Sequence, residues 1–529
     1  MVGKLMLLCL LAIVISTGCK QKSRAPESAA VINEPMNSRS FFVPELLGKE
    51  KISQLQKLMP IADSMIKHYA DSLHIPGFAY GIIADGKLIH TYYKGYTHIA
   101  EKTPVTPSSA FRIASMTKST TSMAILILRD QGKLNLDEPA SKYIKEMADL
   151  KYLTADAPAI TIRDLMIHRA GFPEDNPFGD RQLGNTDKQL LQLMKDGPSF
   201  SNVPGISYEY SNLGFALLGT IITNVSGQPY QQFMMDNIFK PLGMNHTYWD
   251  YTKVPAKDLA HGYRWINNDW QEEEPEPDGS WGSMGGLITT IEDFTKYMNV
   301  HLSAWPPRND PEQPPLKRSS VREMHQASNF DNLNKNHVFP NGRACPLVTS
   351  YGYGLGITRD CDNRLYIGHG GGLPGFGSYW RIMPHYGLGI VVFGNKTYNS
   401  FGSTTMPILD TLLALTGIKP HPLQPSNILE QRKNELMQIL PAWKEATKSP
   451  IFAENFFPDN PIDTLRAKAE TLFAKAGKIK NVTPVQPMNQ LRGHFDVEGE
   501  KAVVRIFFTL SPETGPKIQA ISLSELKVQ

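Results

Sequence analysis

The chain has 529 residues, more than one hydrophobic core usually supports, so a large domain with a smaller companion is expected. It carries 54 Lys and Arg residues against 51 Asp and Glu residues, a formal net charge of +3. This balance, without a concentrated basic run, argues against nucleic acid as a partner.

The N-terminus has the pattern of an export signal. Lys4 supplies a positive start, and residues 5–15 form an apolar run too short to span a bilayer as a stable helix. Small residues then precede Cys19, which resembles a bacterial lipoprotein signal, although Ser16 stands where leucine is usual. An ordinary secretory signal containing an unrelated cysteine is the alternative. We expect a signal peptide over residues 1–18 and a lipid anchor on Cys19, which would place the protein in the bacterial cell envelope, periplasmic or at the outer membrane.

The remaining cysteines and the composition after the signal bear on the redox state and on metals. Residues 19–45 are rich in Ser, Pro, Asn and Lys, as a flexible tether would be. Cys345 and Cys361 lie in a chain expected in a disulfide-permissive compartment, where they are either bridged or free. The chain contains neither CxxC nor HExxH. We therefore expect no metal and no cofactor.

The first expected elements are a helix and a hairpin. A helical pattern covers residues 52–73. Pro76-Gly77 then opens an apolar run to residue 84, and a second run covers residues 87–93. Asp85-Gly86 between the runs is a type I′ turn signal, so a β-hairpin is predicted.

A helical block is then followed by strands. Helical patterns dominate residues 115–244, whereas residues 303–315 (SAWPPRNDPEQPP) predict an irregular surface insertion, because proline disrupts helices and central strands. Residues 378–383 and 388–393 are strand-like. Helices enclosed between sheet-forming segments predict an α+β domain over residues 46–418.

A composition break near residues 419–422 marks a second domain. Beyond it, a helix is expected over residues 463–476, and strands over residues 501–510 and 517–523. We expect a small α+β domain over residues 419–529.

The chemical signal is a serine with a neighbouring base. The SxxK motif places Ser and Lys one helical turn apart, and such pairs perform acyl transfer in known enzymes. It occurs at Ser64/Lys67, Ser115/Lys118 and Ser524/Lys527. Only Ser115 precedes an apolar helix at its expected N-terminus, where free N–H groups and the helix dipole stabilise developing negative charge. A helix-capping serine is the alternative interpretation.

Two further motifs follow in order. Tyr210-Ser211-Asn212 precedes an apolar run, and His369-Gly370-Gly371-Gly372 precedes the strand pair that begins at residue 378. With the flanking segments FRIASMTKS, TIRDLMIHRAGFP and SMGGLITTIEDF, the chain resembles the serine β-lactamase and penicillin-binding-protein superfamily, in its class C β-lactamase-like branch, over about residues 52–418. The resemblance implies an antiparallel sheet flanked by helices, with an inserted helical subdomain.

The resemblance also implies roles. Ser115 is the nucleophile, and Lys118 or Tyr210 takes its proton. Asn212 binds either the substrate amide or the Lys118 ammonium. His369, Gly371 and Gly372 contact the substrate, with the Ser115 and Gly372 N–H groups as the oxyanion hole.

The implied function is a serine hydrolase that forms an acyl-enzyme at Ser115 with a D-amino-acid peptide or an ester. His369 replaces the lysine of true β-lactamases, which argues against antibiotic hydrolysis. Two alternatives stay open: a non-catalytic lipoprotein that binds peptidoglycan fragments, and a penicillin-binding D,D-carboxypeptidase. The oligomeric state is not indicated.

Overall fold

The computed structural model describes residues 47–526, which divide into two compact units, residues 47–422 and residues 423–526. The expected signal peptide, the tether and Cys19 lie outside the described residues. Between residues 47 and 526, no helix has the length and apolar character needed to cross a bilayer.

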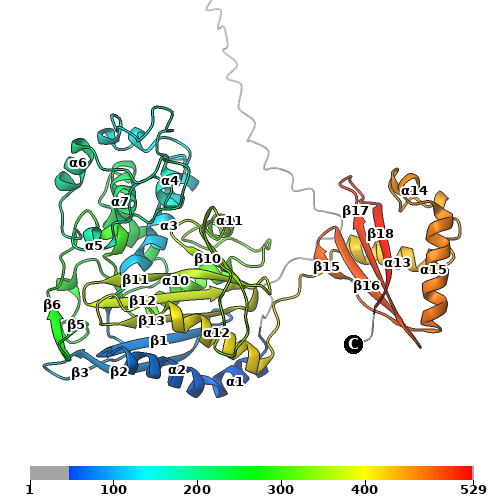
Figure 1. The fold of residues 1–529 in the computed structure, drawn as a ribbon, viewed down its shortest axis with the longest axis horizontal. Helices are drawn as coiled ribbons and strands as arrows, with labels where there is room; N and C mark the ends of the chain where they lie inside the picture. The colour runs from blue at the N-terminus through cyan, green and yellow to red at the C-terminus, as the bar shows by residue number, and fades with distance from the viewer. Residues whose placement is uncertain (1–46, 527–529) are drawn as a thin grey trace, which may run out of the picture. The chain divides into compact units, whose positions relative to one another are not determined.

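A nine-stranded antiparallel sheet organises the larger unit (Figure 1). Its strands run in the order β3-β2-β1-β13-β12-β11-β10-β9-β8, so the N-terminal hairpin pairs with strands from much later in the chain. The strand bounds are β1 Gly77–Ala84, β2 Lys87–His98, β3 Thr103–Pro104, β8 Asn329–Asn334, β9 Leu347–Tyr351, β10 Gly356–Arg359, β11 Leu365–Leu373, β12 Phe376–Met383 and β13 Leu388–Gly394.

The predicted hairpin is confirmed. Asp85 and Gly86 have φ angles of 49° and 73°, and a type I′ turn requires positive φ at both central residues. The turn joins β1 to β2, and the opposite edge of β1 pairs with β13. The hairpin therefore lies inside the sheet.

Apolar side chains on both faces of the sheet build two cores. In β13, Ile390 and Val392 face one core, whereas Val391 and Phe393 face the other, as the two-residue period of a strand requires. The first core also holds apolar residues of α1 (Lys49–Lys57), α2 (Met59–Ser72) and α12 (Gly402–Thr416), and the second those of α3 (Thr117–Asp130), α7 (Asn212–Ser226) and α10 (Ile291–Ser303).

Shorter elements surround α3 and α7. They are α4 Ile162–Met166, α5 Asn176–Gly179, α6 Asp187–Asp196, α8 Tyr230–Met234, α9 Gly282–Gly285 and α11 Arg318–Met324, with the strand pairs β4 Phe111–Arg112 and β7 Ile288–Thr289, and β5 Gly262–Ile266 and β6 Asp269–Glu273. Helices α4 to α7 lie together beyond one face of the sheet (Figure 1). The α+β class with an inserted helical subdomain is confirmed. Residues 304–317 contain no helix or strand, as their prolines indicated.

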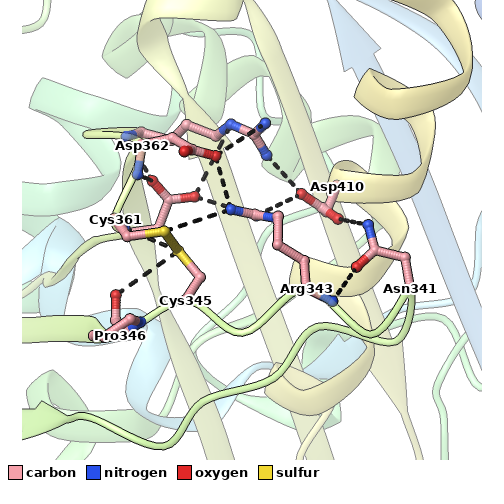
Figure 2. Close-up of a disulfide and its surroundings, with 9 residues drawn as sticks. Asn341, Arg343, Cys345, Pro346, Cys361, Asp362 and Asp410 are labelled. Atoms are coloured by element: carbon pink, nitrogen blue, oxygen red, sulfur yellow. Dashed lines mark hydrogen bonds and ion pairs between the residues drawn. A yellow bond between two sulfur atoms is a disulfide. The ribbon is translucent and has the colours of Figure 1, made fainter.

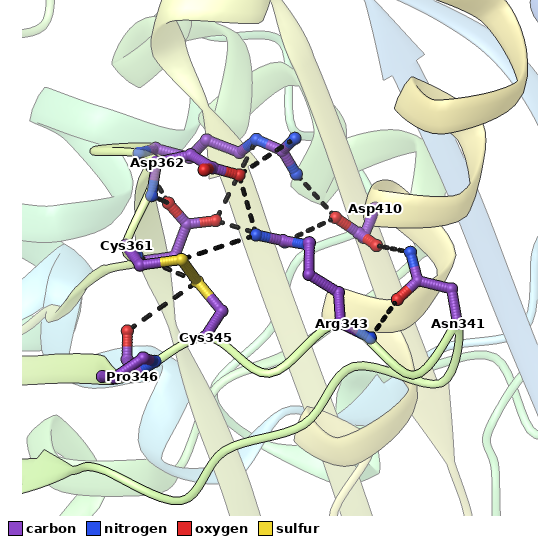
Figure 3. A network of polar contacts seen from close by, with 9 residues as sticks. Asn341, Arg343, Cys345, Pro346, Cys361, Asp362 and Asp410 are labelled. Carbon is purple, nitrogen blue, oxygen red and sulfur yellow. Dashed lines mark hydrogen bonds and ion pairs between the residues drawn. A yellow bond between two sulfur atoms is a disulfide. The ribbon is translucent and has the colours of Figure 1, made fainter.

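A disulfide joins Cys345 to Cys361 (Figure 2). Beside it, Arg343 and Arg364 each reach Oδ1 of the buried Asp410 in α12, at 3.0 and 2.6 Å (Figure 3). Two cations compensate the buried carboxylate, so its burial is not penalised as an isolated charge would be. The bridge and the ion pairs fix the turn between β10 and β11 to α12, and thereby hold the start of β11.

The smaller unit has its own core. Its strands are β14 Ile479–Val482, β15 Gln486–Asn489, β16 Arg492–Gly499, β17 Val503–Leu510 and β18 Ile518–Leu526, and its helices are α13 Asn427–Ile439, α14 Phe456–Asp459 and α15 Ile462–Ala476. Alternate residues of β17, including Ile506 and Phe508, are buried in that core. The helix and the two strands expected here are confirmed.

Candidate active site

Ser115 lies in a 3-10 turn, Ala114–Met116, that leads directly into α3. The serine is 7% exposed. Ala114 before it has a φ of 49°, a left-handed conformation that costs roughly 1–2 kcal/mol for a residue with a Cβ. Pairing of β4 with β7 and the bond from the Ile113 N–H to the Leu287 carbonyl hold this segment. The surrounding sheet therefore fixes a strained backbone at the serine.

Lys118, one turn further along, is completely buried. Its Nζ lies 3.0 Å from Ser115 Oγ, 2.6 Å from Asn212 Oδ1 and 2.8 Å from the Met284 carbonyl oxygen. An ammonium has three N–H donors, so these three acceptors satisfy it completely. The first two motifs are thus brought together around one amine.

Burial controls the charge of this amine. Loss of hydration lowers the pKa of Lys118, and the carboxylates of Asp180 and Asp175 oppose that shift. Burial raises the pKa of Asp180, and the nearby lysine opposes that. Burial therefore favours the neutral amine of Lys118, and the nearby Asp180 carboxylate partly offsets this effect.

Asn212 begins α7, and both ends of its amide are occupied. Its Oδ1 accepts from Lys118, while its Nδ2 donates to Asn176 Oδ1 at 3.1 Å. Asp175 accepts hydrogen bonds from the Asn212 and Leu213 N–H groups at 2.6 and 2.9 Å. These two N–H groups at the helix start have no acceptor within the helix, so the carboxylate satisfies them. Of the two partners expected for Asn212, the structure shows Lys118.

Tyr210 lies beside the serine, and a hydrogen bond joins it to Ser115. Burial raises the pKa of Tyr210 well above its ordinary value, although the bond to Ser115 acts in the opposite direction. Lys118 Nζ lies 4.9 Å from the centre of the tyrosine ring, over its face. Burial therefore favours a protonated Tyr210 and a neutral Lys118.

His168 supports the loop that carries Tyr210. Its Nδ1 accepts a hydrogen bond from the Ser211 N–H at 3.1 Å, and its ring packs 4.3 Å from the Tyr210 ring. Burial and the Lys118 charge lower its pKa well below the ordinary value, so the ring is neutral. His168 therefore has a structural role, because it holds the loop that carries Tyr210 in place.

His369 of the third motif is buried, and both ring nitrogens are engaged. Nδ1 lies 2.5 Å from the Gly370 carbonyl oxygen, an acceptor only, so Nδ1 carries the proton. Nε2 therefore accepts, and the Tyr351 hydroxyl donates to it at 2.7 Å. Burial lowers the pKa of His369 to about 3, so no permanent cation stands at this position.

Gly371 and Gly372 lie in β11 beside the serine. A Cβ on Gly371 would lie 2.2 Å from the Ile113 carbonyl oxygen and 3.0 Å from Ala114 Cβ, so only glycine permits this approach. A Cβ on Gly372 would meet the Tyr398 ring at 3.2 Å. The glycines thus bring β11 directly against the turn that presents Ser115.

The chain matches the Beta-lactamase family model over residues 62–414. It belongs to the beta-lactamase family of serine hydrolases. Protein flp of Staphylococcus aureus is 30% identical over 337 residues, 63% of this chain and 62% of that protein. The unguisins hydrolase ungD' of Aspergillus campestris is 26% identical over 354 residues, covering 64% and 61%. The chain thus spans just over 60% of the length of these relatives.

A solved structure agrees on the fold. The octameric penicillin-binding protein homologue from Pyrococcus abyssi superposes with a TM-score of 0.54 at 19% identity, covering 89% of this chain and 96% of that chain. The expected β-lactamase/transpeptidase-like fold is confirmed.

The family site includes residues that motif spacing did not reveal. Asp175, Asp180 and Tyr351 shape the charges of Lys118 and His369, and each comes from a segment distant from the motifs. The other SxxK serines lie elsewhere: Ser64 is exposed on α2, and Ser524 lies on β18, with Lys527 outside the described residues. Only the position of Tyr351 in an aromatic, glycine-rich run gave any signal in the sequence.

Proposed function

We propose that the protein is a serine hydrolase of the class C β-lactamase-like branch, acting through an acyl-enzyme at Ser115 on an ester or a D-amino-acid peptide. The three contacts of Lys118 carry the proposal. A neutral amine has two N–H donors and one lone pair. Asn212 Oδ1 and the Met284 carbonyl accept the two donors, so the lone pair is left facing Ser115 Oγ.

Acylation follows from this arrangement. The Ser115 hydroxyl proton passes to Lys118 Nζ as Oγ bonds to the substrate carbonyl carbon, and the carbonyl π electrons move onto its oxygen. The new ammonium keeps all three contacts, so proton transfer needs no rearrangement. N–H groups of Ser115 and Gly372 are the proposed donors to the oxyanion.

Collapse of the tetrahedral intermediate expels the leaving group. In our proposal, the protonated Tyr210 gives its proton to the leaving atom and is reprotonated by Lys118, which returns the lysine to its neutral form. Water then attacks the acyl-enzyme and gives a proton to Lys118. When the second intermediate collapses, this proton returns to Ser115 Oγ, and the free enzyme is regenerated.

The third motif bears on the substrate class. A neutral His369, with Nδ1 bonded to Gly370 and Nε2 to Tyr351, provides no permanent cation for a substrate carboxylate. This supports an ester or an uncharged peptide end over a β-lactam antibiotic. The relative named as an unguisins hydrolase is consistent with a hydrolytic reaction.

We further propose that the enzyme works in the bacterial cell envelope on a lipid anchor at Cys19, as the export pattern of the sequence indicates. Growth with a labelled fatty acid should label the wild-type chain and leave the Cys19→Ala chain unlabelled. Equal labelling of both chains would contradict the anchor.

The decisive experiment treats the purified chain with a fluorophosphonate probe and measures intact mass. Wild type should gain one adduct and Ser115→Ala none. Ser64→Ala is the matched control, because it removes the serine of another SxxK motif on an exposed helix face, and it should react like wild type. Failure of the wild type to react with either this probe or a labelled penicillin would favour the peptidoglycan-binding alternative. A stable penicillin adduct with release of D-Ala would favour the carboxypeptidase.

A further inference from the structure

Away from Ser115, two histidines and a glutamate converge from three segments. His98 ends β2, His261 precedes β5, and Glu272 lies in β6. One ligand atom from each lies within 4.8 Å of the other two. We propose that His98, His261 and Glu272 form a binding site for a divalent ion of the zinc type.

The separations are close to those that a metal requires. His261 Nδ1 lies 2.6 Å from Glu272 Oε1, and His98 Nε2 lies 3.8 Å from Glu272 Oε2. Zinc bonds of about 2.0–2.1 Å in a tetrahedron place neighbouring ligand atoms about 3.3 Å apart. Rotation of a histidine ring is needed to reach this spacing, and all three side chains retain the solvent access that such a rotation requires.

The carboxylate of Glu101 also favours metal binding by His98. Glu101 Oε2 lies 3.4 Å from His98 Nδ1, on the opposite side of the ring from the nitrogen that faces Glu272. Histidine ligands commonly present one nitrogen to a metal while a carboxylate holds the other N–H. Glu101 therefore favours the tautomer in which His98 Nε2 carries a free lone pair.

The backbone beneath these side chains is fixed by hydrogen bonds. The His261 N–H donates to the Thr97 carbonyl at 2.9 Å. The fully buried Asn395 donates from Nδ2 to the carbonyls of Tyr96 and His261, both at 3.0 Å. These hydrogen bonds already hold the backbone of the two histidine segments in place. Metal binding would therefore lose little backbone entropy, which favours affinity.

The two imidazoles are close together but parallel, so at least one ring must rotate before both can bind the same ion, because a metal lies in the plane of the imidazole that binds it. The rings of His98 and His261 are stacked, with centroids 4.1 Å apart and planes 7° apart. Glu272 lies at the edge of both rings and supplies negative charge. Two neutral imidazoles and one carboxylate form a common zinc ligand set that leaves a coordination position open.

A metal here would fix one wall of a pocket near the serine. His261 and Glu272 line a cavity of about 260 Å³ that also includes Leu373 and Pro374, immediately after Gly372 in the chain. A Cβ on Gly262 of β5 would lie 2.6 Å from Gly375, so this hairpin packs directly on the β11–β12 turn. The ion would therefore link strand β2 to the hairpin beside the acylation site.

No short sequence motif marks such a site. The three ligands are separated by 163 and 11 residues in the chain, unlike the short spacings of CxxC or HExxH. The proposed site departs from the sequence prediction of no metal, which was based on the absence of short-spaced ligand motifs.

The test is calorimetric titration of the chelator-treated full chain with Zn²⁺, repeated with Co²⁺ to follow its visible absorption. Wild type should bind one ion per chain. His98→Ala and His261→Ala should each weaken binding about 100-fold, and Glu101→Gln about 10-fold. His90→Ala is the matched control, because His90 is a half-buried histidine paired with one carboxylate, Asp63, and it should bind like wild type.

The conservative variant Glu272→Gln, at a half-exposed position, guards against loss of binding through misfolding, and thermal unfolding of every apo chain should match wild type within a few degrees. Absence of saturable binding to wild type would overturn the proposal. Equal affinity in the His98→Ala, His261→Ala and Glu272→Gln chains would also overturn it, because the ion would then bind elsewhere.

Discussion

Replacing Tyr351 with Phe removes one oxygen and breaks a single buried hydrogen bond. His369 Nδ1–H remains bonded to the Gly370 carbonyl, so the ring cannot turn to present a donor elsewhere, and Nε2 is left as a buried acceptor without a partner. Leaving a buried polar atom unsatisfied costs about 1–3 kcal/mol. We expect the free energy of unfolding of the larger unit to fall by that amount.

The same change alters the histidine and the reaction. A donor to the lone pair stabilises the neutral ring, so its loss raises the pKa of His369 from about 3, while burial and Lys118 still hold it below the ordinary value. If the loss of this hydrogen bond raises the activation free energy by about 1.4 kcal/mol, kcat/KM falls roughly 10-fold. Urea denaturation, an NMR titration of the His369 ring and ester hydrolysis measure the three effects.

Tyr208→Phe is the matched control for this prediction. The Tyr208 ring packs 5.8 Å from the Tyr351 ring and 5.8 Å from the His168 ring, and within the described residues its hydroxyl makes no hydrogen bond. It should change stability by less than about 0.5 kcal/mol. If Tyr351→Phe is as stable as wild type, or if both variants lose the same stability, the assigned tautomer and its hydrogen bond are wrong.

Three further predictions follow from the site and its support. Lys118→Met keeps the volume and removes the base, so the rate of acylation by an ester should fall about 1000-fold in a stopped-flow assay. Asp180→Asn removes a carboxylate that raises the pKa of Lys118, so the acidic limb of the kcat/KM profile should move to lower pH by about one unit. Replacing Cys345 and Cys361 by Ala opens a covalent loop with a sequence separation of 16, which should lower the free energy of unfolding by up to about 3 kcal/mol.

Each of these three predictions has an outcome that would contradict it. Wild-type acylation by the Lys118→Met chain would exclude the lysine as the base. A shift of the acidic limb to higher pH in Asp180→Asn would reverse the sign of the proposed coupling, and Asp187→Asn, an exposed carboxylate on α6, should leave the profile unchanged. Unchanged stability of the cysteine double variant under oxidising conditions would show that the ion pairs of Asp410 alone hold this turn.

Local patterns predicted much of the fold because their physical causes are local. Asp85-Gly86 indicated a type I′ hairpin, since few residue pairs adopt positive φ at both positions. The helix expected over residues 52–73 is instead two helices that meet at Leu58, because Pro60 lacks the N–H that an uninterrupted helix would use.

The sequence also predicted which motif residues would meet. Ser115, Lys118, Tyr210 and Asn212 are in contact as their order indicated, and β11 carries His369 to the same place. It could not reveal whether Lys118 or Tyr210 is the better base, because that depends on hydration. Burial lowers the pKa of Lys118 and raises the pKa of Tyr210, and both shifts arise from atoms distant in the chain.

The sequence by itself predicted most of the elements, the family and the candidate nucleophile Ser115, because these depend on short-range periodicity and on residues one helical turn apart. Only the tertiary structure decided how charge is distributed. It brought Asp180 to Lys118, Tyr351 to His369, and His98 to His261 and Glu272. Those pairings depend on strand order and loop packing, and electrostatic interaction depends on distance through space rather than on separation along the chain.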